Sequence, residues 1–286
     1  MRDHVVEGSS AEAVAFKSEG HRLVGRLALP DGPASRVVVL NGATGVPAGY
    51  YRAFADWLSE ARRAAVLTWD YRDFAASATR PARVSRARMS DWMVADQQAA
   101  RDFAARWLPG LPIWVIGHSL GALGLPFQEG TDRIERLISV CSGPVHLSDH
   151  PWPYRAVAAS FWWGPSAWAV RALGYLPARL GPGADLPGGV FRQWRRWCTS
   201  RGFNAGDPAL PEPRGEAFAG SARFVAVADD DLCPPTAVWR HMQAFPEARP
   251  TQRVLRPAEY GLARMGHIAP FARASRACWS DIVGDG

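Results

Sequence analysis

The chain has 286 residues, of which 48% are hydrophobic, and it carries a formal net charge of +6. This length and apolar content can build a large core, so we expect one α/β domain with an insertion. Every basic residue except Lys17 is an arginine, and the arginines are spread along the whole chain. A nucleic-acid site needs clustered positive charge and a recognition motif, so the sequence predicts no nucleic-acid partner.

The first residues and the cysteines bear on the compartment. Residues 1–16 lack a basic segment followed by an apolar core, so we expect no secretory signal. The cysteines show neither metal-ligand spacing nor the density of a disulfide framework. They are Cys141, Cys198, Cys233 and Cys278. Reduced thiols of this kind are typical of a cytoplasmic protein, which is the location we predict.

Strands and helices alternate along most of the chain. Residues 14–17 and 22–29 predict a β-hairpin arm. Apolar strands are then expected at 36–40, 64–69, 113–116, 136–140, 222–228 and 251–255. Helices are expected at 48–63, at 90–107, directly after the strand at 113–116, at 236–245 and from about Ala269 onward. Buried strands that alternate with helices predict a mostly parallel, doubly wound sheet covered on both faces.

Residues 142–213 break this alternation. They hold many prolines and glycines and six of the thirteen tryptophans, namely Trp152, Trp162, Trp163, Trp168, Trp194 and Trp197. We therefore expect a tryptophan-rich helical cap here, inserted into a core formed by 1–141 and 214–286. Within the cap, residues 157–176 are the best candidate for a membrane span, but they contain Arg171 and a Gly-Pro pair. A buried or interfacial helix is expected, with no transmembrane span.

One motif carries chemistry. The strand at 113–116 stops at the pentapeptide GHSLG, residues 117–121, and a helical pattern follows. This strand, turn and helix context is that of a G-x-S-x-G nucleophile elbow, in which Ser119 projects from the top of the sheet. Side chains at Gly117 and Gly121 would collide with the neighbouring strand and helix. The alternative is a glycine-rich turn without chemistry.

An elbow serine needs a base, which follows it in the chain in doubly wound enzymes. Of the seven histidines, only His241 and His267 follow a plausible acid strand, and His241 lies inside a helical pattern. His267 ends a loop between the last strand and the last helix. It is the predicted base, with helix capping as the alternative.

An orienting acid is expected before the base. The strand ending at Ala228 runs into Asp229, Asp230 and Asp231, three carboxylates whose mutual repulsion makes them a poor structural choice. In the expected arrangement the acid lies four residues before the proline that opens the next helix. That proline is Pro234, so the acid is Asp230. Asp231 is the runner-up, and a solvated acidic turn remains the alternative.

An oxyanion hole needs two amides directed at the developing charge. Leu120, which follows the nucleophile, is the first expected donor. The second is Ala43, in the glycine-flanked turn after the strand at 36–40. Thr44 adds a hydroxyl for substrate binding or serves the turn alone.

These residues lie in segments that resemble the α/β-hydrolase superfamily, and within it bacterial hydrolases of the serine aminopeptidase-like branch. The matching segments, in order, are NGATGVPAGYYRAFADWL, TWDYR, DWMVADQQAA, GHSLGA, DLPGGVFRQWRRWC, DDDLCPP and MGHIAPF. The resemblance implies a triad of Ser119, Asp230 and His267. One loop departs from the resemblance. The family has an R-G-x-G-x-S type turn there, whereas this chain has RDFAAS at 72–77, so the resemblance does not predict the shape of the adjoining pocket.

Together these residues predict a serine hydrolase acting on a carboxylic ester or thioester through an acyl-enzyme. A small-molecule substrate with an apolar acyl or aryl group is expected, because Trp162, Trp163 and Trp168 would line the pocket. Packing of these tryptophans onto the sheet is the alternative. Acyl transfer, peptidase activity and a noncatalytic binding role on the same fold also remain open. No metal or cofactor motif is present in the sequence. Assembly into a homodimer remains an alternative to a monomer.

Overall fold

The computed structural model describes residues 11–285. Eight strands form one sheet in the order β1-β2-β4-β3-β5-β6-β9-β10, which is parallel from β4 to β10. The hairpin strands β1 and β2 add to one edge in antiparallel register, so the expected arm is confirmed. The strands are β1 Ala11–Ser18, β2 His21–Ala28, β3 Arg36–Asn41, β4 Ala64–Trp69, β5 Ile113–His118, β6 Ile134–Val140, β9 Ser221–Val227 and β10 Arg249–Leu255.

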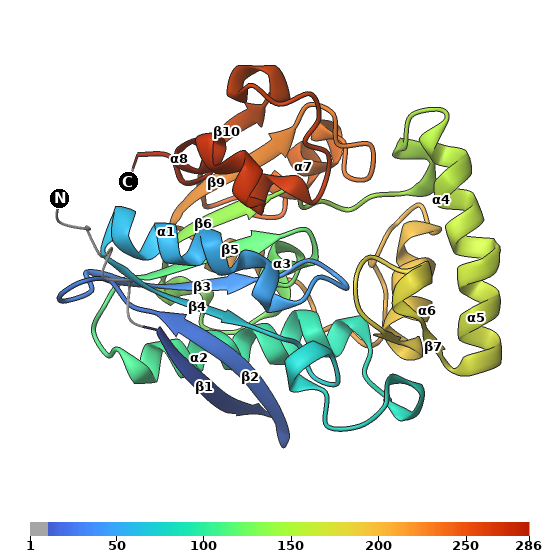
Figure 1. The fold of residues 1–286 in the computed structure, drawn as a ribbon, viewed down its shortest axis with the longest axis horizontal. Helices are drawn as coiled ribbons and strands as arrows, with labels where there is room; N and C mark the ends of the chain where they lie inside the picture. Colours follow the sequence, from blue (N-terminus) through green and yellow to red (C-terminus); the bar gives the residue numbers. More distant parts are fainter. Residues whose placement is uncertain (1–10, 286) are drawn as a thin grey trace, which may run out of the picture.

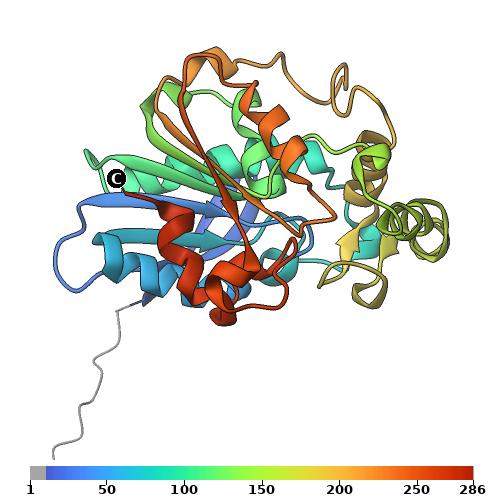
Figure 2. The same ribbon diagram turned by 90° about the horizontal axis from the view of Figure 1, so that it is seen from above.

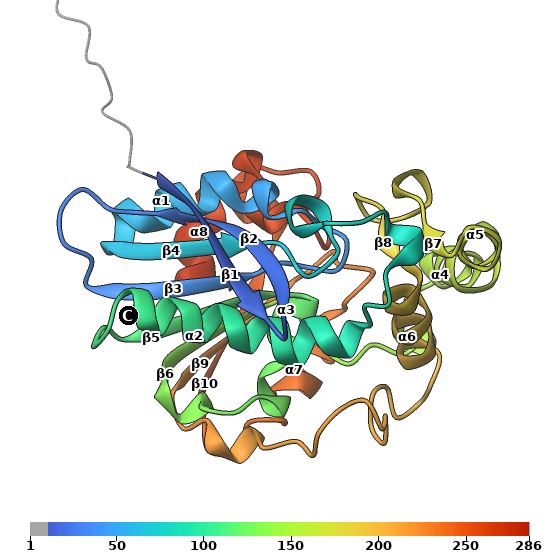
Figure 3. The ribbon, with the colours of Figure 1, turned by 90° about the horizontal axis from the view of Figure 1, so that it is seen from below.

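Helices cover both faces of the sheet, as the alternating pattern predicts. On one face, α1 (Arg52–Arg62) and α8 (Trp279–Val283) bury Phe54, Leu58 and Trp279. On the other face lie α2 (Gln97–Trp107) and α7 (Pro235–Met242) (Figure 3). The short helix α3 (Leu120–Leu123) follows β5 directly. The expected doubly wound architecture is therefore confirmed.

Three of the expected helices differ from the structure at their starts. The helix expected at 48–63 opens with a 3₁₀ turn, Ala48–Tyr51, before α1. The helix expected at 90–107 contains a π-helical stretch, Asp91–Asp96, before α2. The prediction of a terminal helix from Ala269 was wrong. 3₁₀ turns occupy residues 269–271 and 273–278, and the α-helix begins only at Trp279. Pro270 lacks an amide proton and Ala272 is extended, so no α-helix can run through this segment.

The chain between β6 and β9 forms a cap beyond the carboxyl ends of the parallel strands (Figures 1 and 2). Its elements are α4 (Tyr154–Trp163), α5 (Pro165–Leu173), β7 (Tyr175–Leu176), β8 (Leu186–Pro187) and α6 (Gly188–Cys198). Gly164 and Pro165 separate α4 from α5, which divides the apolar stretch at 157–176 into two short helices. Among residues 11–285, no helix is long and apolar enough to cross a membrane.

The loop that departs from the family pattern keeps a left-handed backbone. Asp73 and Ala75 stand where the pattern has glycines, and their φ angles are +56° and +44°. Ser77 closes the loop by donating to the Asp70 carbonyl at 2.6 Å and accepting from the Val24 amide at 2.8 Å. No residue of the loop lines the cavity beside Ser119. The replacement of these glycines therefore strains the backbone of the loop and leaves the lining of the cavity unchanged.

We predict that Ala75→Gly raises the free energy of unfolding by about 0.5–1 kcal/mol. Relief of about 1–2 kcal/mol of steric strain is partly offset by the greater freedom of glycine in the unfolded chain. Ala76→Gly is the matched control, because Ala76 has no positive φ, and it should lower stability by a similar amount. Urea unfolding of both variants measures this, and equal losses in the two would refute strain at Ala75.

Candidate active site

The turn after β5 holds Ser119 in a strained backbone conformation. Its φ and ψ are +54° and −116°. A Cβ added to Gly121 would lie 2.1 Å from the Asn41 carbonyl oxygen of β3, and one added to Gly117 would lie 2.4 Å from the Ala122 amide nitrogen of α3. The predicted steric reason for both glycines is therefore confirmed. The elbow places Ser119 on the wall of a cavity.

Asp230 and His267 form a buried pair. The Nδ1 atom of His267 lies 2.8 Å from Oδ2 of Asp230, and the aspartate side chain is fully buried. The other oxygen, Oδ1, accepts the amides of Leu232 and Cys233 at 2.9 and 2.8 Å. These bonds fix the carboxylate, which in turn fixes the imidazole. Of the three adjacent aspartates, the one selected from the sequence faces the predicted base.

The neighbouring aspartates also have partners. Asp229 accepts the successive amides of Met265 and Gly266 at 3.0 and 2.9 Å, and so holds the loop that carries His267. Asp231 makes an exposed contact of 3.3 Å with Arg264. Sequence reasoning missed the role of Asp229, because its partners are backbone amides 36 and 37 residues away.

Within the described residues, no hydrogen bond joins Ser119 to His267. One group of possible metal ligands includes the pair: atoms of Cys141, Asp230 and His267 lie within 4.8 Å of one another. Burial raises the pKa of the Cys141 thiol well above its usual value, whereas a metal binds the thiolate. The Asp230 carboxylate of this group is engaged by His267 and by the amides of Leu232 and Cys233.

The predicted second oxyanion donor is engaged elsewhere. The Ala43 amide donates to the hydroxyl of Tyr51 at 2.8 Å, so the expectation for Ala43 needs correction. Thr44 lines the cavity beside Ser119, as does Leu120. Within residues 11–285, the Thr44 amide donates to no protein acceptor. In the described part of the chain, Thr44 therefore offers a free N–H group beside the cavity in addition to its hydroxyl.

A buried histidine connects the elbow to both neighbouring loops. Burial lowers the pKa of His118 to about 3, so the ring is neutral. Its Nε2 lies 2.9 Å from the His267 carbonyl oxygen and must donate to it. Its Nδ1 therefore accepts from the Tyr51 hydroxyl at 2.8 Å, and that hydroxyl accepts from Ala43. Three hydrogen bonds thus link the loop after β3, the elbow and the loop that carries His267.

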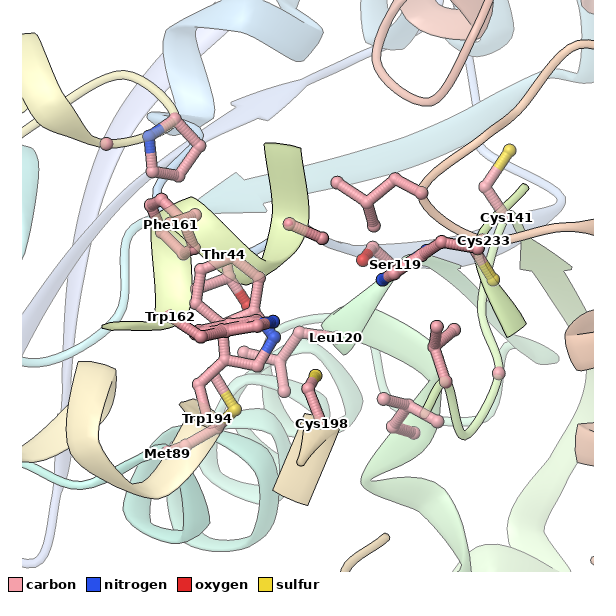
Figure 4. Close-up of a pocket in the computed structure, with 18 of the residues that line it drawn as sticks. Thr44, Met89, Ser119, Leu120, Cys141, Phe161, Trp162, Trp194, Cys198 and Cys233 are labelled. Atoms are coloured by element: carbon pink, nitrogen blue, oxygen red, sulfur yellow. The ribbon is translucent and has the colours of Figure 1, made fainter. Parts of the chain in front are cut away.

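A cavity of about 290 Å³ opens beside Ser119, between the sheet and the cap (Figure 4). Its walls are mainly apolar, and the aromatic ones come from the cap. They are Tyr154, Phe161, Trp162, Trp194 and Phe203. Trp162 is only 4% exposed and lines this cavity.

The other two cap tryptophans expected to line the pocket do not reach it. Trp163 and Trp168 lie on the outer surface, 48% and 68% exposed. That expectation was wrong for both, because they project from the opposite side of the cap helices.

The rejected histidine, His241, is buried in α7. Its Nδ1 lies 3.3 Å from the Ser139 hydroxyl, and burial lowers its pKa to about 4. The unfolded chain, with a histidine pKa of about 6.5, therefore binds a proton that the folded chain excludes between pH 6.5 and 4.

We therefore predict that the free energy of unfolding falls as the pH is lowered through this window. His241 contributes up to about 1.4 kcal/mol per pH unit, and His118 acts in the same direction. His241→Leu should make the pH dependence shallower by about one proton. Urea unfolding at several pH values between 7 and 4 tests this, and identical slopes for the two proteins would contradict it.

No model of a protein family matches the sequence, and no curated protein is similar to it. Solved structures do match. An esterase of Pyrococcus furiosus has a TM-score of 0.63 at 14% identity, with 96% of this chain and 89% of the esterase covered. The thioesterase domain from the curacin biosynthetic pathway has a TM-score of 0.56 at 15% identity, with 96% and 99% covered. A bacterial membrane phospholipase A has a TM-score of 0.59 at 13% identity, with 96% and 86% covered.

At these identities the likeness is one of fold. Together with the eight-stranded, mostly parallel sheet and its flanking helices, it shows that this chain has the α/β-hydrolase fold.

Proposed function

We propose that the protein is a serine hydrolase that cleaves a carboxylic ester or thioester with an apolar acyl or aryl group. The observation that carries this proposal is the strained Ser119 at the wall of an apolar cavity, with the fixed Asp230–His267 pair on the adjoining loops. The esterases and the thioesterase domain of the same fold support the reaction class. The reaction and the roles below are derived from the chemistry of these side chains.

Ser119 attacks the acyl carbonyl and gives its proton to Nε2 of His267. In serine hydrolases this hydrogen bond is often long without substrate and shortens in the complex. Asp230 keeps the proton of His267 on Nδ1 and stabilises the imidazolium that forms. The leaving alcohol or thiol takes the proton from Nε2, and an acyl-enzyme remains. Water, deprotonated by His267, then releases the acid and restores Ser119.

The oxyanion is bound by two amides at the edge of the cavity. Leu120 opens α3, so its N–H is among those a helix leaves without an internal partner. We propose the Thr44 amide as the second donor, in place of Ala43. The Ala43–Tyr51 bond holds this loop against the elbow, so that the donors are oriented before substrate arrives.

We predict that Ser119→Ala lowers kcat for a p-nitrophenyl ester by about 10⁴-fold or more and abolishes labelling by a fluorophosphonate, because the nucleophile is lost. Circular dichroism should show an unchanged fold. Full activity in this variant would remove the proposed nucleophile. Assays with and without an added amine or alcohol separate hydrolysis from acyl transfer, and peptide substrates test for peptidase activity.

The aspartates provide a matched series. Asp230→Asn should lower kcat by about 10⁴-fold, because the amide favours the wrong imidazole tautomer; this magnitude is that of the chymotrypsin-type example of the same change. Asp231→Asn should retain most activity, since its partner is an exposed arginine. Asp229→Asn should fall between them, because it weakens the hold on the base loop. A dead Asp231→Asn with an active Asp230→Asn would overturn the assignment of the acid.

The cap offers a second matched pair. Trp162→Ala should change the ratio of kcat/KM for long and short acyl esters by several fold, because Trp162 lines the cavity and each buried methylene contributes about 0.8 kcal/mol. Trp168→Ala should leave that ratio unchanged, because the side chain is outside the cavity. If both variants keep the wild-type ratio, the cavity is not the acyl site.

A further inference from the structure

The outer side of the cap carries an aromatic groove that the proposed reaction does not use. It runs between α5 and α6, and we call it the cap groove. It is lined by Trp163, Ala167, Trp168, Val170, Arg171, Gly174, Phe191, Arg192 and Arg195. Tryptophan and arginine dominate this surface, and none of the lining residues is acidic.

Exposed apolar side chains gather on the cap. Six large hydrophobic residues are exposed among residues 11–285, and all but Val84 belong to the cap. Those of the cap are Trp152, Val157, Trp163, Trp168 and Leu173. α4 and α5 form the end of the molecule farthest from the sheet (Figures 1 and 3). Two of these exposed residues, Trp163 and Trp168, line the cap groove, and contiguous exposed apolar surface marks an interaction site.

The arginines of the cap groove lack protein counter-charges. Within the described residues, Arg171, Arg192 and Arg195 take part in no ion pair, and the guanidinium carbon of Arg195 lies 5.7 Å from the centre of the Trp163 ring. Residues 150–184 contain three arginines and no aspartate or glutamate. The groove therefore offers unpaired positive charge beside exposed aromatic rings.

This combination is complementary to an anionic lipid surface. Tryptophan favours the boundary between lipid headgroups and hydrocarbon, and arginine binds phosphate through paired N–H donors. A twofold contact between two copies would bring the same arginines of both copies together, so the charge opposes self-association.

We propose that the cap groove docks the protein onto a bilayer containing anionic phospholipids, with the arginines on phosphate groups and Trp163 and Trp168 in the interface. The attachment is peripheral. It is a second function of the cap, separate from the acyl cavity on its inner side.

Co-sedimentation with vesicles tests the proposal. The wild-type protein should bind vesicles of phosphatidylcholine with 30% phosphatidylglycerol and should not bind phosphatidylcholine alone. The variant with Arg171→Gln, Arg192→Gln and Arg195→Gln should lose on the order of 100-fold in affinity, from the usual contribution of basic residues near an anionic surface. The double variant Trp163→Ser and Trp168→Ser should also bind at least about 10-fold more weakly.

A control variant removes three positive charges from arginines outside the cap groove. Arg22, Arg249 and Arg273 are exposed and, within the described residues, unpaired, so their triple glutamine variant should bind within about twofold of wild type. Turnover of a soluble ester, measured for every variant, tests the proposed reaction independently of vesicle binding. Equal binding to both lipid compositions, no binding to either, or equal losses in both arginine triples would overturn the proposal. So would a wild-type dimer in sedimentation that the double tryptophan variant dissociates.

Discussion

The neutral state of His118 is the constraint on which the site depends. One ring nitrogen donates to the His267 carbonyl and the other accepts from Tyr51, which accepts from Ala43. A protonated ring would have two donors, and the Tyr51 hydroxyl would then have no acceptor at this position. Complete burial keeps the ring neutral. One uncharged side chain therefore holds the backbone around Ser119, the loop after β3 and the loop that carries His267.

The cap and the core share their packing. One hydrophobic cluster includes Leu120 of the elbow, Met89 before the π-helical stretch, and Trp162, Leu176 and Val190 of the cap. Displacing the cap would expose part of this cluster to water at a cost of about 25 cal/mol per Å² of apolar surface. The volume beside Ser119 is thus fixed by the same contacts that stabilise the fold.

The elements and the polar pair could be predicted from sequence because their causes are local or follow from chain order. Gly117 lies against α3, five residues further along the chain, and Gly121 lies against the neighbouring parallel strand β3. Parallel strands also bring the loops holding Asp230 and His267 to one edge of the sheet. Ala43 was misjudged because its hydrogen-bond acceptor belongs to Tyr51 on another element. Trp162 and Trp163 are adjacent in sequence, and only the orientation of α4 decides which one faces the cavity.

The arginine-rich composition has a practical consequence. Lys17, the only lysine, is exposed on β1, the edge strand of the sheet. Apart from an amino terminus, amine-directed chemistry would therefore modify a single position, outside both the cavity beside Ser119 and the cap groove. A dye or a surface tether attached there through an amide bond would leave both sides of the cap uncovered.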